Sequence, residues 1–415
     1  MCPRKELGDP SSESDHDSHV SDSDSDVSMT DSSSSSSESD SGTKHETEQI
    51  IPQCSNAEDS IVLNEEEEDD EVVKAIIRER NKVRQHPADI ECEDFVTDIC
   101  FHPSEDIIVA ATVTGDALVY KYNNDNNELS ETLELHLKSC RDVEFNDDGT
   151  LLYSTSKDKS IMVSDMKTGK LKQVYENAHD APVYSLLVVN PNILASGDDD
   201  GTVKLWDMRK KGAIFSLKEM EDYVSCMITN DAKKFIVCAS GDGTITSLNI
   251  GMRKLHIQSE PYNTEITGLA TVKHDRKLVA ATAKGTVYLF NWGEFGYHSD
   301  EFPNPKKGIN SLIPITENII LTACEDGILR ATHLFPHRHL GVAGQHQLPV
   351  ECVDISHDGD LIASYGHDQL IKFWRIRYFE DIEIDGKKKS VKKTQSHNLP
   401  SSKYKNASDF FADMA

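Results

Sequence analysis

The stretch Asp200-Gly201-Thr202-Val203-Lys204-Leu205-Trp206 decides the fold, because segments of the same kind recur along the chain. Their last residues are Tyr120, Ser164, Trp206, Leu248, Phe290, Thr332 and Trp374, so the steps between them are 44, 42, 42, 42, 42 and 42 residues. A repeat of roughly 40 to 45 residues is typical of a propeller whose blades are four-stranded sheets. The sequence therefore predicts an all-β chain with seven blades.

The third copy shows how one blade is built. Residues 193–197 and 200–207 are short runs rich in apolar and β-branched side chains, bounded by Gly, Pro, Asn or Asp, which is the pattern of strands joined by tight turns. His179 stands ahead of these runs, and Trp206-Asp207 ends the third strand. In these residues the chain resembles the WD-repeat family, and the resemblance implies a seven-bladed WD-repeat β-propeller.

The resemblance also implies a hydrogen-bonded tetrad of His, Ser or Thr, Asp and Trp inside a blade. Two blades carry residues at all four positions: His179, Ser196, Asp200 and Trp206 in the third, and His346, Ser364, Asp368 and Trp374 in the seventh. The second blade keeps His136 and Asp158 but has Ser164 where the Trp would stand. Because strand alternation and turns set the repeat, we expect a complete ring whose blades are stabilised unevenly.

The seven copies occupy residues 90–384, which we expect to be the propeller domain. A propeller must close its ring, since otherwise one blade keeps an unpaired strand edge. Either residues 88–93 or residues 375–384 can supply the outer strand of the closing blade, and both alternatives stay open at this point.

The segment before the propeller has a different composition. Residues 1–70 hold 21 acidic side chains against 3 basic ones and contain long serine runs, so we expect a disordered acidic tail. Serines beside Asp or Glu suit acidophilic kinases, and the tail is either a regulated binding segment or only a solubilising one. Residues 71–89 are predicted to form a short helix or linker, which either packs on the propeller or binds a partner.

The segment after the propeller, residues 385–415, is rich in lysine. Its cluster of Lys387, Lys388, Lys389, Lys392 and Lys393 is typical of nuclear import signals and of nucleic-acid patches, and the alternative is a solvated tail. The chain starts without an apolar secretory segment and has no run of about eighteen apolar residues. We therefore expect a nuclear protein, with some in the cytoplasm and no membrane partner.

The cysteines and the known catalytic motifs point away from an enzyme. The nine cysteines are scattered without a Cys-x-x-Cys pair, and there is no Gly-x-Ser-x-Gly elbow, phosphate-binding loop or His-Glu-x-x-His. We expect no catalysis, cofactor, metal or small-molecule substrate. The densest histidine group, His333, His337 and His339 near His346, is better explained as a surface connection between strands than as a metal site.

A propeller presents the loops of all its blades on a common rim and can hold several protein partners there. In the WD-repeat family the residue before the tetrad Asp faces that rim, which implies contact positions at Lys157, Asp199, Glu325 and His367.

The parts taken together resemble a nucleolar branch of the WD-repeat family. These parts are the acidic serine-rich start, the divergent blades, the lysine-rich end and the segment Asp409-Phe410-Phe411-Ala412-Asp413-Met414. The resemblance implies a non-catalytic scaffold in the nucleolus for ribosomal RNA processing and large-subunit biogenesis, with pre-ribosomal assembly factors as partners. The net charge of -29 opposes broad attraction to phosphates, so RNA contact is expected to be indirect or through the lysine-rich tail.

One short motif predicts a different function. Trp206-Asp207-Met208-Arg209 resembles the box by which some WD-repeat proteins dock on the adaptor of cullin-RING ubiquitin ligases. The docking residues would be Trp206, Asp207 and Arg209, with Arg209 as an exposed bidentate donor. The alternative is that Trp-Asp is the ordinary structural ending of a blade and is followed by an arginine without that role.

Overall fold

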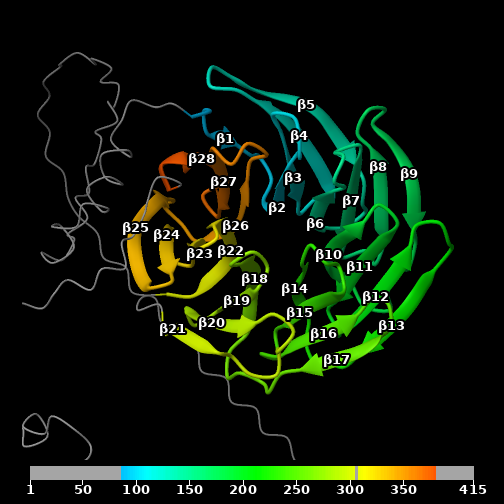
Figure 1. Ribbon diagram of the computed structural model, residues 1–415. Helices are drawn as coiled ribbons and strands as arrows, with labels where there is room; N and C mark the ends of the chain where they lie inside the picture. The colour runs from blue at the N-terminus through cyan, green and yellow to red at the C-terminus, as the bar shows by residue number, and fades with distance from the viewer. Residues whose placement is uncertain (1–85, 304–306, 380–415) are drawn as a thin grey trace, which may run out of the picture. The chain divides into compact units, whose positions relative to one another are not determined.

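The computed structural model describes residues 86–303 and 307–379, which form seven four-stranded antiparallel sheets around a central axis (Figure 1). This confirms the predicted seven-bladed, all-β propeller. The predicted acidic tail, the lysine-rich tail and nearly all of the predicted helix at 71–89 lie outside the described residues. The described part of 71–89, residues 86–89, contains no helix.

Each blade is a meander of four strands, with the first strand innermost and the fourth outermost. Blade 1 consists of β2 (Val96–Phe101), β3 (Ile107–Thr112), β4 (Asp116–Tyr122) and β5 (Asn127–Glu134). Blade 2 consists of β6 (Cys140–Phe145), β7 (Leu151–Ser156), β8 (Ile161–Asp165) and β9 (Lys170–Tyr175). Blade 3 consists of β10 (Val183–Asn190), β11 (Ile193–Asp198), β12 (Thr202–Asp207) and β13 (Ala213–Lys218).

The remaining blades repeat this order. Blade 4 consists of β14 (Val224–Thr229), β15 (Phe235–Ser240), β16 (Ile245–Asn249) and β17 (Lys254–Gln258). Blade 5 consists of β18 (Ile266–Val272), β19 (Lys277–Thr282), β20 (Thr286–Asn291) and β21 (Asp300–Pro303). Blade 6 consists of β22 (Ile309–Thr316), β23 (Ile319–Cys324), β24 (Ile328–Leu334) and β25 (His337–Gln345), and blade 7 of β26 (Val350–Ile355), β27 (Leu361–Gly366), β28 (Leu370–Arg375) and β1 (Ile90–Glu91).

The burial pattern explains why the second strands read as continuous apolar runs. Both faces of such a strand pack against neighbouring blades, so β15, Phe-Ile-Val-Cys-Ala-Ser, is buried at every position. The outermost strand of a blade has one face in solvent, and β9, Lys-Leu-Lys-Gln-Val-Tyr, is mostly exposed. The hydrophobic core is therefore spread over the contacts between blades, with several separate clusters around the ring.

The N-terminal segment closes the ring. β1 pairs with β28 through Ile90 opposite Ile371 and Glu91 opposite Leu370. Ile90 is buried in the same cluster as Phe373. The competing candidate, the segment after β28, instead forms the short 3-10 helix η1 (Arg377–Phe379). No helix in the described part of the chain is long and apolar enough to cross a membrane.

Side chains also join neighbouring blades along the central channel. The side chain of the second residue of an innermost strand, or of the third residue in blade 3, donates a hydrogen bond to the carbonyl of the first strand residue in the next blade. These bonds are Thr97 to Cys140 at 2.6 Å, Ser185 to Val224 at 2.8 Å, Ser225 to Ile266 at 2.5 Å, Thr267 to Ile309 at 2.6 Å and Asn310 to Val350 at 2.9 Å. Blades 2 and 7 carry Arg141 and Glu351 at this position, and these charged side chains line the channel instead.

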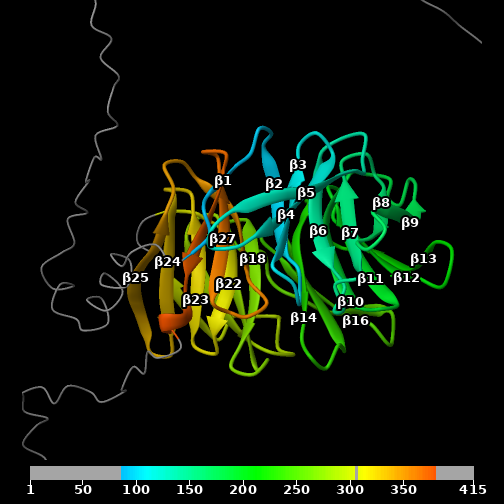
Figure 2. The same ribbon diagram turned by 90° about the horizontal axis from the view of Figure 1, so that it is seen from above.

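The innermost strands run from one face of the ring to the other (Figure 2). We call the face on which these strands begin, near Phe95 and Val96, the channel-mouth face. The turns between the first and second strands of each blade, such as residues 102–106, lie on the opposite face because they follow the far ends of the innermost strands.

Candidate partner-binding site

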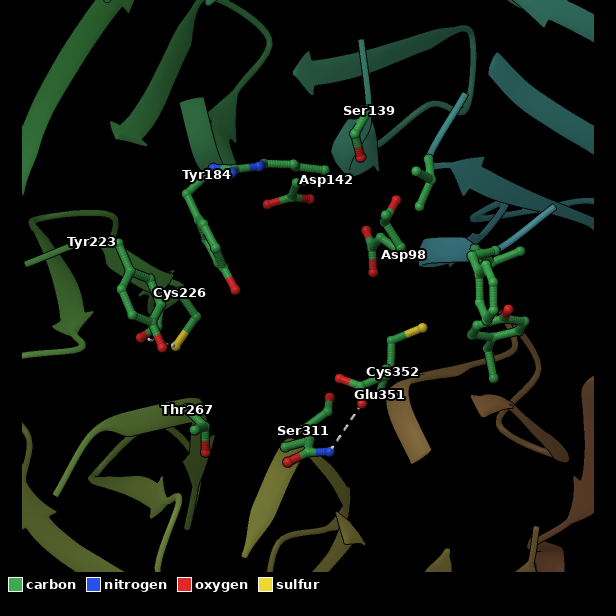
Figure 3. A pocket seen from close by; sticks show the side chains of 18 of the residues that line it. Asp98, Ser139, Asp142, Tyr184, Tyr223, Cys226, Thr267, Ser311, Glu351 and Cys352 are labelled. Carbon is green, nitrogen blue, oxygen red and sulfur yellow. Dashed lines mark hydrogen bonds between the residues drawn. The ribbon is translucent and has the colours of Figure 1, made fainter. Parts of the chain in front are cut away.

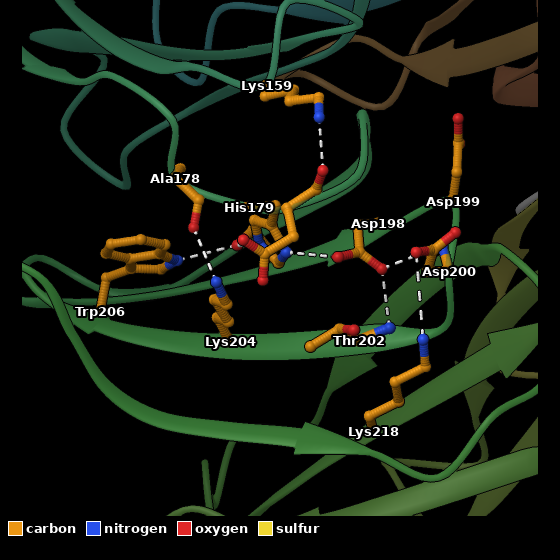
Figure 4. A network of polar contacts seen from close by, with 12 residues as sticks. Lys159, Ala178, His179, Asp198, Asp199, Asp200, Thr202, Lys204, Trp206 and Lys218 are labelled. Carbon is orange, nitrogen blue, oxygen red and sulfur yellow. Dashed lines mark hydrogen bonds and ion pairs between the residues drawn. The ribbon is translucent and has the colours of Figure 1, made fainter. Parts of the chain in front are cut away.

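A polar network inside blade 3 ties β11, β12 and the loop before β10 together (Figure 4). His179 Nδ1 donates to Asp198 Oδ2 at 2.8 Å, and His179 Nε2 lies 2.6 Å from the Ser196 hydroxyl. Trp206 Nε1 donates to the same hydroxyl at 2.8 Å. Burial alone would raise the pKa of Asp198, but the hydrogen bond from His179 and two backbone N–H donors hold it below its ordinary value. All four side chains are buried, so the network stabilises the blade and is not open to a ligand.

The expected place of Asp200 in this network was wrong. Its side chain is 62% exposed and lies 3.9 Å from Lys218, while its backbone N–H donates to Asp198. Blade 7 shows the physical reason: Gly366 stands where blade 3 has Asp198, and a Cβ at Gly366 would lie 2.8 Å from His346 Nδ1. In blade 7, where this position is glycine, the later aspartate, Asp368, fills the space beside the histidine. In blade 3 the position is Asp198, and its own carboxylate contacts the histidine in place of Asp200.

In blade 7 the structure brings the four expected residues together. His346 Nδ1 lies 2.9 Å from Asp368 Oδ1, its Nε2 lies 2.7 Å from Ser364, and Trp374 Nε1 donates to Ser364 at 2.7 Å. Burial lowers the pKa of His346 more than the Asp368 carboxylate raises it. The imidazole is therefore held neutral, with one nitrogen donating to the aspartate and the other free to accept from the serine.

Blade 2 has a related network without the tryptophan. His136 lies 2.9 Å from both Ser154 and Ser160 and 3.2 Å from Asp158. The Ser164 hydroxyl, at the position of the missing indole, is buried without a hydrogen-bond partner among the described residues. These three blades are thus stabilised differently.

The channel-mouth face opens into a cavity of about 760 Å³ that residues of all seven blades line (Figure 3). Asp98, Tyr184 and Glu351, from three different blades, surround the opening. The rings of Tyr184 and Tyr223 lie 4.7 Å apart. A cavity with aromatic walls and a few polar groups is the usual form of a binding site.

Exposed apolar side chains gather around this opening. Phe95 is 52% exposed, and the backbone N–H of its neighbour Val113, itself exposed, donates to the Phe95 carbonyl at 2.9 Å. Leu137 and Leu348, in loops that lead into the innermost strands of blades 2 and 7, are exposed on the same face. A set of exposed apolar side chains on one face is typical of a protein-interaction surface.

The four expected rim residues all lie on the channel-mouth face. Each donates its backbone N–H to a carbonyl just before an innermost strand, and the donors are Lys157, Asp199, Glu325 and His367. Asp199 is paired with Arg141, and His367 lies 2.8 Å from Glu351 and lines the cavity. Lys157 and Glu325 are exposed.

Half-buried carboxylates on the innermost strands were missed from the sequence. Each accepts a backbone N–H from the next blade: Asp98 from Val143 at 3.1 Å, Asp142 from Leu186 at 2.7 Å, Glu144 from Val188 at 2.6 Å and Asp354 from Phe101 at 2.6 Å. Desolvation raises the pKa of Asp142 to about 7, of Glu144 to about 8 and of Asp354 to about 6. The available signal was the presence of acidic residues inside the first strand of a blade.

The motif that resembles an adaptor-docking box lies on the opposite face. Arg209 is 67% exposed, but its Nε and Nη2 already donate to the two oxygens of Asp207 at 2.8 and 2.9 Å. The hydrogen bond from Arg209 lowers the pKa of Asp207 to about 2. A partner at this place would meet the remaining guanidinium donors, while Trp206 is buried within the blade.

The histidine group near Pro336 is distributed over two strands. His333 is the penultimate residue of β24 and its Nδ1 lies 2.9 Å from the Pro336 carbonyl, and His337 begins β25 and lies 3.3 Å from Asp300. Within residues 86–303 and 307–379, no group of three or more His, Cys, Asp or Glu side chains is arranged to hold a metal ion.

Comparison with known proteins agrees with this architecture. The model of the WDR55 family matches residues 87–379. The chain is 53% identical over 353 residues to a WD repeat-containing protein 55 homolog from Aedes aegypti, covering 85% of this chain and 75% of that protein. Homologs from Drosophila willistoni and Drosophila melanogaster are 52% and 51% identical, each over 85% of this chain and over 70% and 71% of their own lengths. The chain belongs to the WDR55 family of WD-repeat β-propellers.

Proposed function

We propose that this protein is a non-catalytic docking scaffold in the nucleolus that supports ribosomal RNA processing and large ribosomal subunit biogenesis. WD-repeat propellers generally mediate contacts between proteins, and this chain belongs to one of their families. The nucleolar setting and the ribosomal role are what the resemblance to that family implies. They are consistent with the lysine cluster at 387–393, which suits nuclear import.

The observation that carries the scaffold proposal is the channel-mouth face. Its exposed Phe95 and Val113 line the cavity, and the exposed Leu137 and Leu348 lie on the same face in the loops before β6 and β26. The histidines and aspartates that resemble catalytic groups lie instead inside the blades, where they hold strands together. The reactive residue types therefore serve the fold, and the accessible surface is suited to binding.

The charge of this face favours a protein partner over bare RNA. Asp98, Asp142, Glu265 and Glu351 line the cavity. Phosphate groups need clustered Lys and Arg for attraction, and carboxylates at the opening repel them. Pre-ribosomal assembly factors are accordingly the partners that we propose for this face, with any RNA contact made indirectly or by the lysine-rich tail.

The second candidate function, a substrate receptor of a cullin-RING ubiquitin ligase, rests on a different surface. Its supporting observation is the exposed guanidinium of Arg209, on the face opposite the channel mouth. Because the two surfaces lie on different faces, a substitution on one leaves the other intact. The two functions can therefore be tested in a single experiment.

The experiment is affinity purification from nuclear extract, with partners quantified by mass spectrometry. It compares the intact protein, a Phe95→Ser/Tyr184→Ser variant of the channel mouth and an Arg209→Ala variant of the opposite face. The scaffold proposal expects pre-ribosomal proteins with the intact chain and with Arg209→Ala, and their loss with the channel-mouth variant. Equal recovery of pre-ribosomal proteins with all three, or their absence from all three, would contradict it. A ligase adaptor lost only with Arg209→Ala would establish the second function.

A further inference from the structure

The part of the channel-mouth face that belongs to blades 3, 4 and 5 is strongly negative. Its loops carry the carboxylates of Asp199, Asp200, Glu221, Asp222, Asp242 and Glu265. The basic side chains that reach this part are already engaged: Arg141 with Asp199, Lys218 with Asp200, and Lys284 with the Asn263 carbonyl. Within residues 86–303 and 307–379 the remaining carboxylates form no ion pair, so a positively charged ligand is favoured here.

Aromatic rings stand beside these carboxylates. Tyr223 donates its hydroxyl to Glu265 at 3.1 Å and lies against Tyr184. The guanidinium carbon of Arg141 lies 5.1 Å from the centre of the Tyr184 ring while the same group pairs with Asp199. The protein therefore already holds one guanidinium between a tyrosine face and a carboxylate, which is a favourable combination for arginine.

The cavity behind the rings is lined by hydrogen-bond acceptors. Asp98 and Asp142 line it, and each has one carboxylate oxygen engaged by a backbone N–H of the next blade. The Tyr365 hydroxyl is fully buried, lines the same cavity and has no hydrogen-bond partner among the described residues. The basic side chains among the cavity's lining residues, Arg141 and His367, are both paired with other acids. The cavity thus offers carboxylate and hydroxyl oxygens, while its own basic side chains are already engaged.

We infer that the channel mouth receives an arginine side chain from an extended, basic segment of a partner protein. The guanidinium supplies five N–H donors in a planar fork, and its face stacks on aromatic rings. The main chain of the segment lies across Tyr223 and the acidic loops of blades 3 to 5, and the arginine enters between Tyr184 and the channel carboxylates. This inference rests on the proposed function in taking the channel mouth as the docking face, and it names the chemistry of the partner.

The test measures binding to the full-length protein by fluorescence anisotropy. The probe is a fluorescein-labelled peptide of alternating arginine and glycine, and its control carries citrulline, the neutral analogue, in place of each arginine. We expect the arginine peptide to bind about tenfold or more tightly than the citrulline peptide, because citrulline lacks the positive charge that complements the carboxylates of this face. The variant Asp222→Asn/Glu265→Gln keeps both hydrogen-bond acceptors but removes their charge, and we expect it to weaken arginine binding by about tenfold.

A matched control separates a local site from the overall negative charge. Glu105→Gln/Asp147→Asn removes the same two charges from exposed turns on the opposite face. The inference expects this control variant to bind the arginine peptide as the native chain does. Equal loss in both double variants, or equal affinity for the arginine and citrulline peptides, would overturn it.

The lysine segment of the same chain is the competing occupant. If changing Lys387, Lys388, Lys389, Lys392 and Lys393 to Gln raises peptide affinity about tenfold, that segment occupies the mouth and the assignment to a partner is overturned. An unchanged affinity supports the partner. The arginine inference and the proposed function can fail separately. If the peptide does not bind but Phe95→Ser/Tyr184→Ser still loses pre-ribosomal proteins, only the arginine inference is contradicted.

Discussion

His179 donates its Nδ1 proton to Asp198 across 2.8 Å, and Asp200, two residues further along the same turn, takes no part in the contact. Asp198 also accepts the backbone N–H of Thr202 at 2.7 Å. One buried carboxylate thus fixes both the histidine and the turn between β11 and β12. The carboxylate of Asp200 remains at the surface.

This relationship predicts opposite outcomes for two adjacent substitutions. Asp198→Ala leaves the buried His179 nitrogen without an acceptor and should lower the free energy of unfolding by about 1–3 kcal/mol. Asp200→Ala removes an exposed side chain and a weak pair with Lys218, so its effect should be within about 0.5 kcal/mol. Urea unfolding followed by tryptophan fluorescence measures the free energy of unfolding of both variants. A larger loss of stability in Asp200→Ala than in Asp198→Ala would mean that Asp200 is the tetrad aspartate after all.

Gly366 makes the corresponding prediction for blade 7. A Cβ added there would lie 2.8 Å from His346 Nδ1 and 3.0 Å from Asp368 Oδ1, so Gly366→Ala must separate the pair. We expect a loss of about 1–3 kcal/mol, as for other overpacked sites. Differential scanning calorimetry measures the shift in melting temperature, and an unchanged value would show that the pair tolerates the methyl group.

The closure of the ring can be tested at Ile90. This side chain is buried against blade 7 although β1 is only two residues long. Ile90→Ala should cost about 2–4 kcal/mol, since it removes buried methyl groups and leaves a cavity. Limited proteolysis of the variant should also cut the N-terminal segment faster than in the native protein. A variant with native stability and native cleavage would mean that β1 contributes nothing to closure.

Glu144 predicts a dependence of stability on pH. Desolvation raises its pKa from 4.5 to about 8, so between these values the folded protein holds a proton that the unfolded chain has released. Stability from this group is therefore present at low pH and is lost as the pH rises toward 8. Glu144→Gln keeps an acceptor for the Val188 N–H and does not titrate.

The pH effect is measured as a difference between two proteins. Compared with the native chain, Glu144→Gln should gain about 2 kcal/mol or more in free energy of unfolding between pH 5 and pH 8. The other side chains are the same in both proteins, so the comparison isolates the effect of the Glu144 substitution. A constant difference across this range would mean that Glu144 does not titrate there.

The sequence predicted the ring because its signals are local. Glycine and aspartate turns recur with a fixed period, and seven periods imply seven blades whatever the individual tetrads contain. The resemblance to the WD-repeat family also identified the histidines, serines and tryptophans of blades 3 and 7. Asp198 was missed because spacing from Trp206 does not show which of two aspartates reaches the histidine. In blade 7 the earlier position is Gly366, which leaves the space to the later aspartate, whereas in blade 3 Asp198 fills that space itself.

Long-range features could not be predicted in the same way. Closure depends on two residues, Ile90 and Glu91, too few to give a strand pattern. The channel carboxylates accept hydrogen bonds from other blades, about 44 residues away for Asp142 and Glu144, and no local pattern reports such a partner. The pairing of Arg141 with Asp199, and its position over Tyr184, likewise join blades 2 and 3.

The most direct test of the account is chemical cross-linking of lysines in nuclear extract, followed by purification of this protein and identification of the cross-linked peptides. The channel-mouth face carries exposed Lys138, Lys157 and Lys284, and the opposite face carries Lys167 and Lys233. The account predicts that cross-links to other proteins concentrate on the first three lysines and disappear with Phe95→Ser/Tyr184→Ser. Cross-links that concentrate on Lys167 and Lys233 and survive that substitution would contradict it.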